Sequence, residues 1–208
     1  MPTLDILTQF FLASVALGLA PGPDNIYVLT QAAVLGRGAG MVITLGLCTG
    51  LILHTALVAL GVAALITASP RLFLALKIGG AGYLLYLAYQ AFRAVETRMT
   101  LTDQDHVAYL NLYRRGVLMN ITNPKVSVFF LAFLPQFVRP ENGNITQQMI
   151  VLGGTFIVAT LLVFNGIALT AAGLATRLRS SATAQLVLYR ITGVVLILLA
   201  LRLLFYRA

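Results

Sequence analysis

The sequence predicts an all-α integral membrane protein with about six transmembrane helices, arranged as two inverted three-helix repeats. Three observations predict this fold class: the chain is 59% hydrophobic, only 10% of its residues are charged, and its apolar runs are long. Soluble domains carry roughly 25% charged residues, so this chain has too few to cover a surface that faces water. A membrane-spanning helix needs about 20 mostly apolar residues, and the runs meet that length.

Six apolar runs follow one another along the 208 residues and leave room only for short loops. We place them at about Leu4–Leu35, Gly40–Thr67, Leu72–Arg93, Arg115–Val138, Gln148–Ala175 and Leu186–Tyr206. Turn-forming residues separate most of them, at Gly36-Arg37-Gly38, Ser69-Pro70-Arg71, Arg139 to Asn144 and Arg177 to Ser181. A polar stretch, Glu96 to Asn111, lies in the middle. We therefore expect a single transmembrane domain over residues 1–208.

The net charge of +8 indicates how the chain is oriented, because the basic residues lie mostly between apolar runs. Cytoplasmic loops are enriched in Lys and Arg, and basic loops are attracted to anionic lipids. One side of the six spans would carry Arg37, Arg93, Arg98, Arg114, Arg115, Arg177 and Arg179; the other would carry Arg71, Arg139 and Arg207, with Arg202 near the last helix end. The first side is therefore predicted to be cytoplasmic and both termini periplasmic. Nucleic acid is not an expected partner.

The two halves of the sequence contain matching segments in the same order. The pairs are Pro23-Asp24 with Pro124-Lys125, Met41 and Gly46 with Met149 and Gly154, and Lys77 to Gly80 with Arg190 to Gly193. A unit of three helices starts and ends on opposite sides of the membrane, so two tandem units must be inverted. We expect one repeat at about 1–95, a polar loop at about 96–112 and a second repeat at about 113–208.

Proline motifs are predicted to break the first and fourth helices, at Pro21-Gly22-Pro23 and at Asn123-Pro124. Proline removes a backbone hydrogen bond and clashes with the preceding turn. A new helix would then start at each motif, with Gly22 or Asn123 as its cap and proline in its first position. Such a helix start presents free N–H groups and partial positive charge, which suits a carboxylate. Inverted repeats with helices broken at matching positions point to a binding site near the midplane.

Polar residues beside these breaks are the predicted substrate and ion site: Gly22, Pro23, Asp24, Asn25, Asn120, Asn123, Pro124 and Lys125. A charged side chain at the bilayer centre costs roughly 2.5–3.5 kcal/mol, so Asp24 and Lys125 are expected to face the protein interior or water. Together they suit a zwitterion, with its ammonium at Asp24 and its carboxylate at Lys125 or a helix start. Asp24 is also the candidate proton carrier. The alternative is structural: Asp24 stabilises its helix start, and Lys125 pairs with it and lines nothing.

Four further polar residues lie within the apolar runs and are weaker candidates for a pathway. His54 is placed to relay protons or to pack through a hydrogen bond, and Asn165 is a buried amide. Lys77 and Arg190 lie one or two turns inside their spans, where extension of the charged group to the lipid headgroups is the ordinary behaviour.

The two motifs resemble the signatures of the LysE/RhtB family of amino-acid exporters. The first is Pro21-Gly22-Pro23-Asp24-Asn25, followed by Gly36 to Gly40 and Gly46; the second is Asn120 to Lys125, followed by Phe129-Phe130 and Phe133 to Phe137. The resemblance implies export of an amino acid or close derivative across the bacterial inner membrane, driven by the proton motive force. It selects no particular amino acid.

Other classes of protein find less support in the sequence. A cation or metal-ion carrier, the main alternative, would need several intramembrane carboxylates or a His/Cys cluster, and Asp24 is the only acid in mid-span. Cys48 is the only cysteine, and neither a Walker A motif nor a His-Glu-x-x-His motif occurs, so we expect no enzyme, cofactor or bound metal. The expected partners are an amino acid, a coupling proton and membrane lipids. A homo-oligomer is compatible with this pattern but not required by it.

Overall fold

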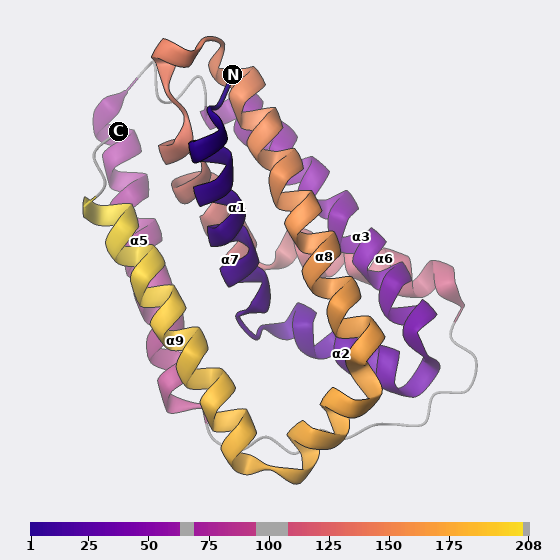
Figure 1. Ribbon diagram of the computed structural model, residues 1–208. Coiled ribbons are helices and arrows are strands. Elements are labelled where there is room, and N and C mark those ends of the chain that lie inside the picture. Colours follow the sequence, from indigo (N-terminus) through magenta and orange to yellow (C-terminus); the bar gives the residue numbers. More distant parts are fainter. Residues whose placement is uncertain (63–68, 95–107, 206–208) are drawn as a thin grey trace.

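The computed structural model describes residues 1–62, 69–94 and 108–205, and within these ranges the ordered elements are all helical. Figure 1 shows their arrangement. They are α1 (Leu4–Leu19), α2 (Pro23–Leu35), α3 (Arg37–Leu57), the π-helix η1 (Val58–Val62), α5 (Pro70–Arg93), α6 (Tyr109–Thr122), α7 (Pro124–Val128), the π-helix η2 (Phe129–Phe133), the 3₁₀ turns η3 (Leu134–Phe137) and η4 (Pro140–Asn142), α8 (Ile145–Ser180) and α9 (Ala182–Phe205).

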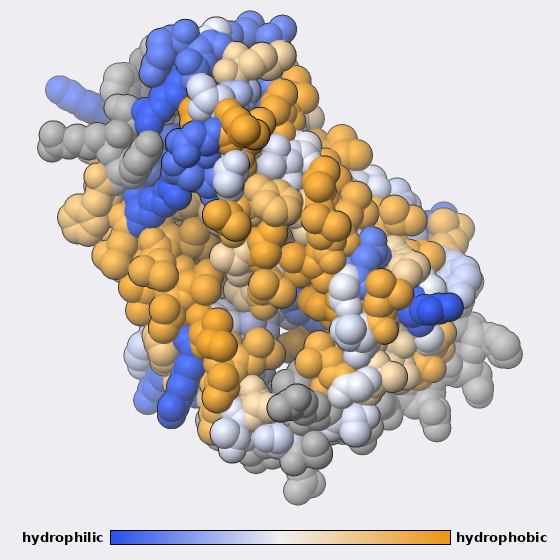
Figure 2. All heavy atoms as spheres, viewed as in Figure 1, coloured by the Kyte–Doolittle hydropathy of each residue, from blue (hydrophilic) through white to orange (hydrophobic). Residues whose placement is uncertain are grey.

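Four helices in the described ranges are long and apolar enough to cross a membrane: Arg37–Gly61, Arg71–Arg93, Ile145–Thr176 and Thr183–Phe205. Two bent pairs, Leu4–Leu19 with Pro23–Leu35 (64°) and Tyr109–Thr122 with Pro124–Phe137 (50°), bring the number to six if each pair is one span. Figure 2 shows apolar side chains over most of the visible face, with the largest hydrophilic group at its upper end and smaller ones at the lower left and the right. A surface this apolar suits lipid rather than water. The chain is thus a helical membrane protein of four to six spans.

The helix ends follow from local sequence. The Thr3 side chain caps α1 by accepting a hydrogen bond from the Ile6 N–H, and Asn144 caps α8 in the same way through the Gln147 N–H. Between α2 and α3, Gly36 has φ 88°, which favours glycine and lets the chain reverse within one residue. The amino group of Met1 donates to the carbonyl of Asn142, so the N-terminus lies beside η4.

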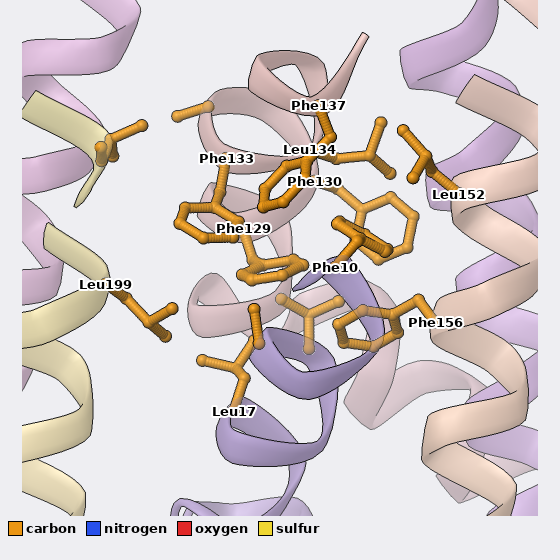
Figure 3. Packing of buried hydrophobic residues seen from close by; sticks show 14 of the residues in the cluster. Phe10, Leu17, Phe129, Phe130, Phe133, Leu134, Phe137, Leu152, Phe156 and Leu199 are labelled. Atoms are coloured by element: carbon orange, nitrogen blue, oxygen red, sulfur yellow. The ribbon is translucent and has the colours of Figure 1, made fainter. Parts of the chain in front are cut away.

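Close helix packing surrounds the two bent pairs. Helix α3 packs against α6, α8 packs against α1, α2 and α3, and α5 packs against α9. Helices α3 and α6 come closest where Gly46 faces Gly116: a Cβ on Gly116 would lie only 2.5 Å from the Ile43 carbonyl oxygen. Phenylalanine side chains from α1, η2, η3 and α8 interlock in the core above the first break, as Figure 3 shows; they are Phe10, Phe129, Phe130, Phe133, Phe137 and Phe156.

Two predicted boundaries were wrong. Helix α6 begins at Tyr109, inside the predicted polar stretch, and α8 continues to Ser180, so only Ser181 separates α8 from α9. At 36 residues α8 is about 54 Å long, more than the roughly 30 Å of hydrocarbon in a bilayer. A helix satisfies its own backbone in water as well as in lipid, so it need not end at the membrane surface. Most of the polar loop lies outside the described residues, as do Arg98 and Arg207, and the side chains of Arg177 and Arg179 are not described either.

Candidate functional site

Lys125 joins the two bent pairs. It is the second residue of α7, and its ammonium Nζ donates to the carbonyl oxygens of Ala20 (2.9 Å) and Leu17 (3.4 Å) at the end of α1. The last carbonyls of a helix have no partner within it and carry partial negative charge. The Lys125 side chain therefore caps α1 from a helix more than 100 residues away in sequence.

Asp24 faces the same ammonium but is held less firmly. It is the second residue of α2, only 4% exposed, and its Oδ1 lies 3.9 Å from Lys125 Nζ. Among the described residues, Asp24 Oδ1 has no hydrogen-bond partner. A buried carboxylate is stabilised fully only when charge pairing is accompanied by hydrogen bonds. Asp24 therefore retains capacity to accept a hydrogen bond.

Gly22 permits this ion pair to lie against the linker between α1 and α2. A Cβ at position 22 would stand 2.8 Å from Asp24 Oδ1 and 3.1 Å from Lys125 Nζ. Gly22 is also the N-cap of α2, with Pro23 as the first helical residue and no side chain capping the N–H groups. The start of α2 thus keeps its partial positive charge unmatched by a side-chain cap.

Two asparagine side chains form hydrogen bonds at the helix breaks, and a third asparagine, Asn120, lies nearby. Asn25 Nδ2 donates to the Gly18 carbonyl (2.6 Å), and Asn123 Oδ1 accepts from the Lys125 N–H (3.0 Å), which caps α7 ahead of Pro124. The Asn120 carbonyl lies 3.3 Å from His54 Nε2, whereas the Asn120 Oδ1 is buried and has no partner within the described residues. Asn120 therefore offers a second unused acceptor near the ion pair.

A small cavity brings part of the predicted site together. Asp24, Asn120 and Lys125 line it, together with Leu17, Gly18, Leu47, Val126, Phe156, Thr160 and Phe164. Its volume is about 10 Å³, close to the space of a single water molecule. An amino acid would fit only after the surrounding helices move apart.

Helix α8 contributes a wall to the cavity that the sequence analysis missed. Phe156, Thr160 and Phe164 lie four residues apart, so they share one face of the helix. The same spacing occurs on any packed helix, so it carries no signal of a cavity by itself. Their role emerges only because α8 packs across α1 and α2.

The four weaker candidates do not line this cavity. His54 is buried on α3 and contacts the ring of Phe130 (5.5 Å between ring centroids) as well as the Asn120 carbonyl. Asn165 on α8 and Lys77 on α5 are half-buried, and Arg190 on α9 is exposed. Within the described residues, no group of three or more His, Cys, Asp or Glu side chains is placed to hold a metal ion.

Comparison with known proteins supports the family that the two proline motifs indicate. A sequence model of the LysE type translocator family matches residues 15–207. The homoserine/homoserine lactone efflux protein of Salmonella typhi is 38% identical over 160 residues, which are 76% of this chain and 77% of that protein. Its counterpart in Salmonella typhimurium is 35% identical over 159 residues, again 76% and 77% of the two chains. No solved structure matches the chain.

An uncharacterized membrane protein of Vibrio cholerae is also similar, at 33% identity over 177 residues, covering 85% of this chain and 86% of that protein. The family match extends over nearly the whole chain and includes both proline motifs, Asp24 and Lys125. It confirms the resemblance that those motifs carry, and it assigns the molecule to transporters rather than enzymes. The chain belongs to the LysE type translocator family.

Proposed function

We propose that this chain is a secondary active exporter of an amino acid or close derivative across the bacterial inner membrane, coupled to proton entry. One observation carries the proposal: a buried acid and a buried base, Asp24 and Lys125, meet at a cavity between two bent helix pairs. The names of the Salmonella relatives support homoserine-like compounds as the first substrates to test.

Substrate recognition is proposed to use the unsatisfied groups around the cavity. A substrate ammonium would bind between Asp24 Oδ1 and Asn120 Oδ1, two acceptors of cavity-lining residues that lack hydrogen-bond partners within the described residues. A carboxylate would bind the Lys125 ammonium and the uncapped start of α2. Because the ammonium of Lys125 now holds the end of α1, a bound carboxylate would compete with the Leu17 and Ala20 carbonyls for it.

Proton coupling is proposed to arise from competition at Asp24. The carboxylate binds a substrate ammonium when ionised and loses that affinity when it accepts a proton. A carrier whose single acid holds either a proton or the substrate, but not both, exchanges one for the other. Protons that arrive from the periplasm would therefore release the substrate there and return with the empty carrier.

Alternating access would follow from two inverted repeats, each beginning with a broken span. The packing supports this arrangement, because α3 packs on the second bent pair as α8 packs on the first, while α3 meets α8 and α5 meets α9. These are the contacts that a two-fold axis in the membrane plane would relate. A site at the crossing of two such repeats opens to either side when one moves against the other.

Transport by purified protein in proteoliposomes tests the function directly. Vesicles are loaded with a panel of labelled amino acids and homoserine lactone, and efflux is followed under an imposed pH gradient together with internal pH. We expect efflux of at least one of these compounds, matched by proton movement in the opposite direction, and loss of both in Asp24→Asn at equal protein content.

Two results would contradict the proposal. Movement of a divalent cation with no movement of any amino acid would favour the alternative of a cation carrier. Wild-type efflux in both Asp24→Asn and Lys125→Ala would show that the ion pair does not form the site. The second result would leave the family assignment intact, because the family match extends over residues 15–207 rather than over these two residues alone.

A further inference from the structure

Thr160 differs from other threonines in the helices. A threonine within a helix ordinarily donates its hydroxyl to the carbonyl four residues earlier. Such bonds occur here at Thr8, Thr30, Thr44, Thr49, Thr55, Thr122, Thr155, Thr170, Thr176 and Thr192. Within the described part of the chain, Thr160 makes no hydrogen bond, although its carbonyl partner would be Phe156, one turn earlier on the same helix.

Thr160 nevertheless belongs to the wall of the cavity. The residue is only 5% exposed and lines the same cavity as Asp24, Asn120 and Lys125. A hydroxyl that lines a cavity and makes no hydrogen bond to the described residues can still donate one and accept one, so it is available to a ligand bound there.

The surroundings of Thr160 define what that ligand looks like. The other residues of this wall are apolar, with Phe156 and Phe164 one turn away on either side and Leu47 contributed by α3. The charged groups that line the cavity are Asp24 and Lys125, which the α-ammonium and α-carboxylate of an amino acid would occupy. No acidic lining residue is then left for a cationic side chain such as that of lysine or arginine.

We propose that Thr160 is a specificity-determining residue that hydrogen-bonds a hydroxyl on the substrate side chain. The substrate class is then short, neutral, hydroxylated amino acids, in which the side chain reaches α8 while the α-substituents lie at the two helix breaks. This inference rests on the proposed function. It adds the group that distinguishes a hydroxylated side chain from an aliphatic one of the same length.

Paired substrates separate this role from packing. Homoserine and 2-aminobutyrate differ only in the terminal hydroxyl, and kcat/KM for each is measured in proteoliposomes with wild type and Thr160→Val. Valine has nearly the shape of threonine without the hydroxyl. We expect the preference for homoserine over 2-aminobutyrate to fall about tenfold in Thr160→Val, the worth of one ordinary hydrogen bond.

Two control variants test whether a change in preference comes from misfolding or from removing any threonine hydroxyl on this helix. Thr160→Ser keeps a hydroxyl at the cavity and should retain the wild-type preference. Thr170→Val lies on the same helix but is exposed, and its hydroxyl donates to the Gly166 carbonyl (2.8 Å), so its preference should be unchanged. Detergent-solubilised samples should give the same elution volume and thermal midpoint for all variants that are compared.

The outcomes distinguish the two proposals. If wild type moves amino acids and Thr160→Val keeps the same preference, or loses both substrates equally while Thr160→Ser also loses them, the role of Thr160 is overturned and the exporter stands. If wild type moves no amino acid at all, the proposed function fails and the inference fails with it.

Discussion

At the scale of single residues, the ammonium of Lys125 has partners of two kinds. It donates to two carbonyls at the end of α1, and it lies 3.9 Å from a carboxylate that makes no hydrogen bond within the described residues. The hydrogen bonds hold the fold, whereas the longer contact leaves Asp24 available to a ligand. The two charged residues should therefore respond differently to substitution.

Neutralising each charge tests that asymmetry. In Lys125→Met the end of α1 loses its cap and Asp24 is left as a buried, unpaired charge, so we expect a loss of stability of about 3–5 kcal/mol together with loss of export. In Asp24→Asn the ammonium keeps both carbonyls, so export should fall while stability changes by less than about 1 kcal/mol. Thermal unfolding in detergent, combined with export at matched membrane abundance, gives both quantities. Equal destabilisation by the two substitutions would contradict this division of roles.

At the scale of elements, each bent pair joins a helix end to a helix start, and side chains from both halves stabilise the junctions. The start of α7 is capped by Asn123, whereas the start of α2 has no side-chain cap. This difference makes the α2 start the more available anion site. The cap also holds α7 in place, because the Asn123 side chain accepts a hydrogen bond from the backbone N–H of Lys125, the residue whose side chain carries the ammonium.

Removing the α7 cap should therefore affect both stability and the position of Lys125. Asn123→Ala is expected to lower stability by about 0.5–2 kcal/mol, the usual worth of an N-cap. Export should also fall, because the helix start that carries the ammonium becomes less ordered. The thermal midpoint of the purified protein and the export rate are measured together. Asn123→Ser preserves a capping oxygen and should restore both, and a failure to do so would show that the amide has some other role.

The glycines of α3 and α8 test how closely the two predicted repeats match. A Cβ on Gly46 would collide with the Tyr113 backbone of α6, whereas Gly154, its sequence counterpart on α8, has open space around it. We expect Gly46→Ala to separate α3 from α6 and lower the yield of folded protein. Gly154→Ala should be neutral or stabilise its helix by up to about 1 kcal/mol. Comparable losses in both variants, measured by thermal unfolding, would contradict the packing described here.

Gly46 and Gly154 also illustrate which parts of the structure can be predicted from the sequence. Apolar run length predicted the membrane class, and the proline motifs directed attention to Asp24, Asn120 and Lys125, which do line one cavity. The α8 wall and the hold of Lys125 on α1 were not predictable, because they depend on which helix faces meet in space. Helix ends were misplaced at Tyr109 and Ser180 because hydropathy follows lipid contact, whereas a helix continues wherever its backbone is satisfied.

At the scale of the whole molecule, the N-terminus and the end of α9 lie at one end, which fits an even number of crossings. Met1 contacts Asn142 in η4, and Arg202 near the end of α9 donates to Gln9 on α1 (2.7 Å). Figure 1 shows the start of α1 and the end of α9 at the same end of the bundle, opposite the turn between α8 and α9. The opposite end has the turn at Gly36 beside Arg37 and the start of α6, and the positive-inside count predicts that this end is cytoplasmic.

Cysteine labelling of cells tests this orientation. Cys48 is buried and is first replaced by alanine, and single cysteines are then introduced at the exposed positions Glu141 and Asn111. A membrane-impermeant maleimide should label Glu141→Cys in intact cells and Asn111→Cys only after the membrane is permeabilised. The reverse pattern would place the N-terminus in the cytoplasm and contradict the predicted orientation.

The pairing of one acid with one base at the cavity has a consequence for the energetics of the cycle. In the proposed cycle, the pair sums to zero charge while Asp24 is ionised and a zwitterion adds none, so the loaded stroke would be electrically silent. Once Asp24 holds a proton, the returning carrier would bear the single positive charge of Lys125 and move toward the negative interior. That stroke would gain roughly 2.3 kcal/mol for each 100 mV of membrane potential. Such a carrier would keep pumping against a steep gradient even when the two aqueous phases have equal pH.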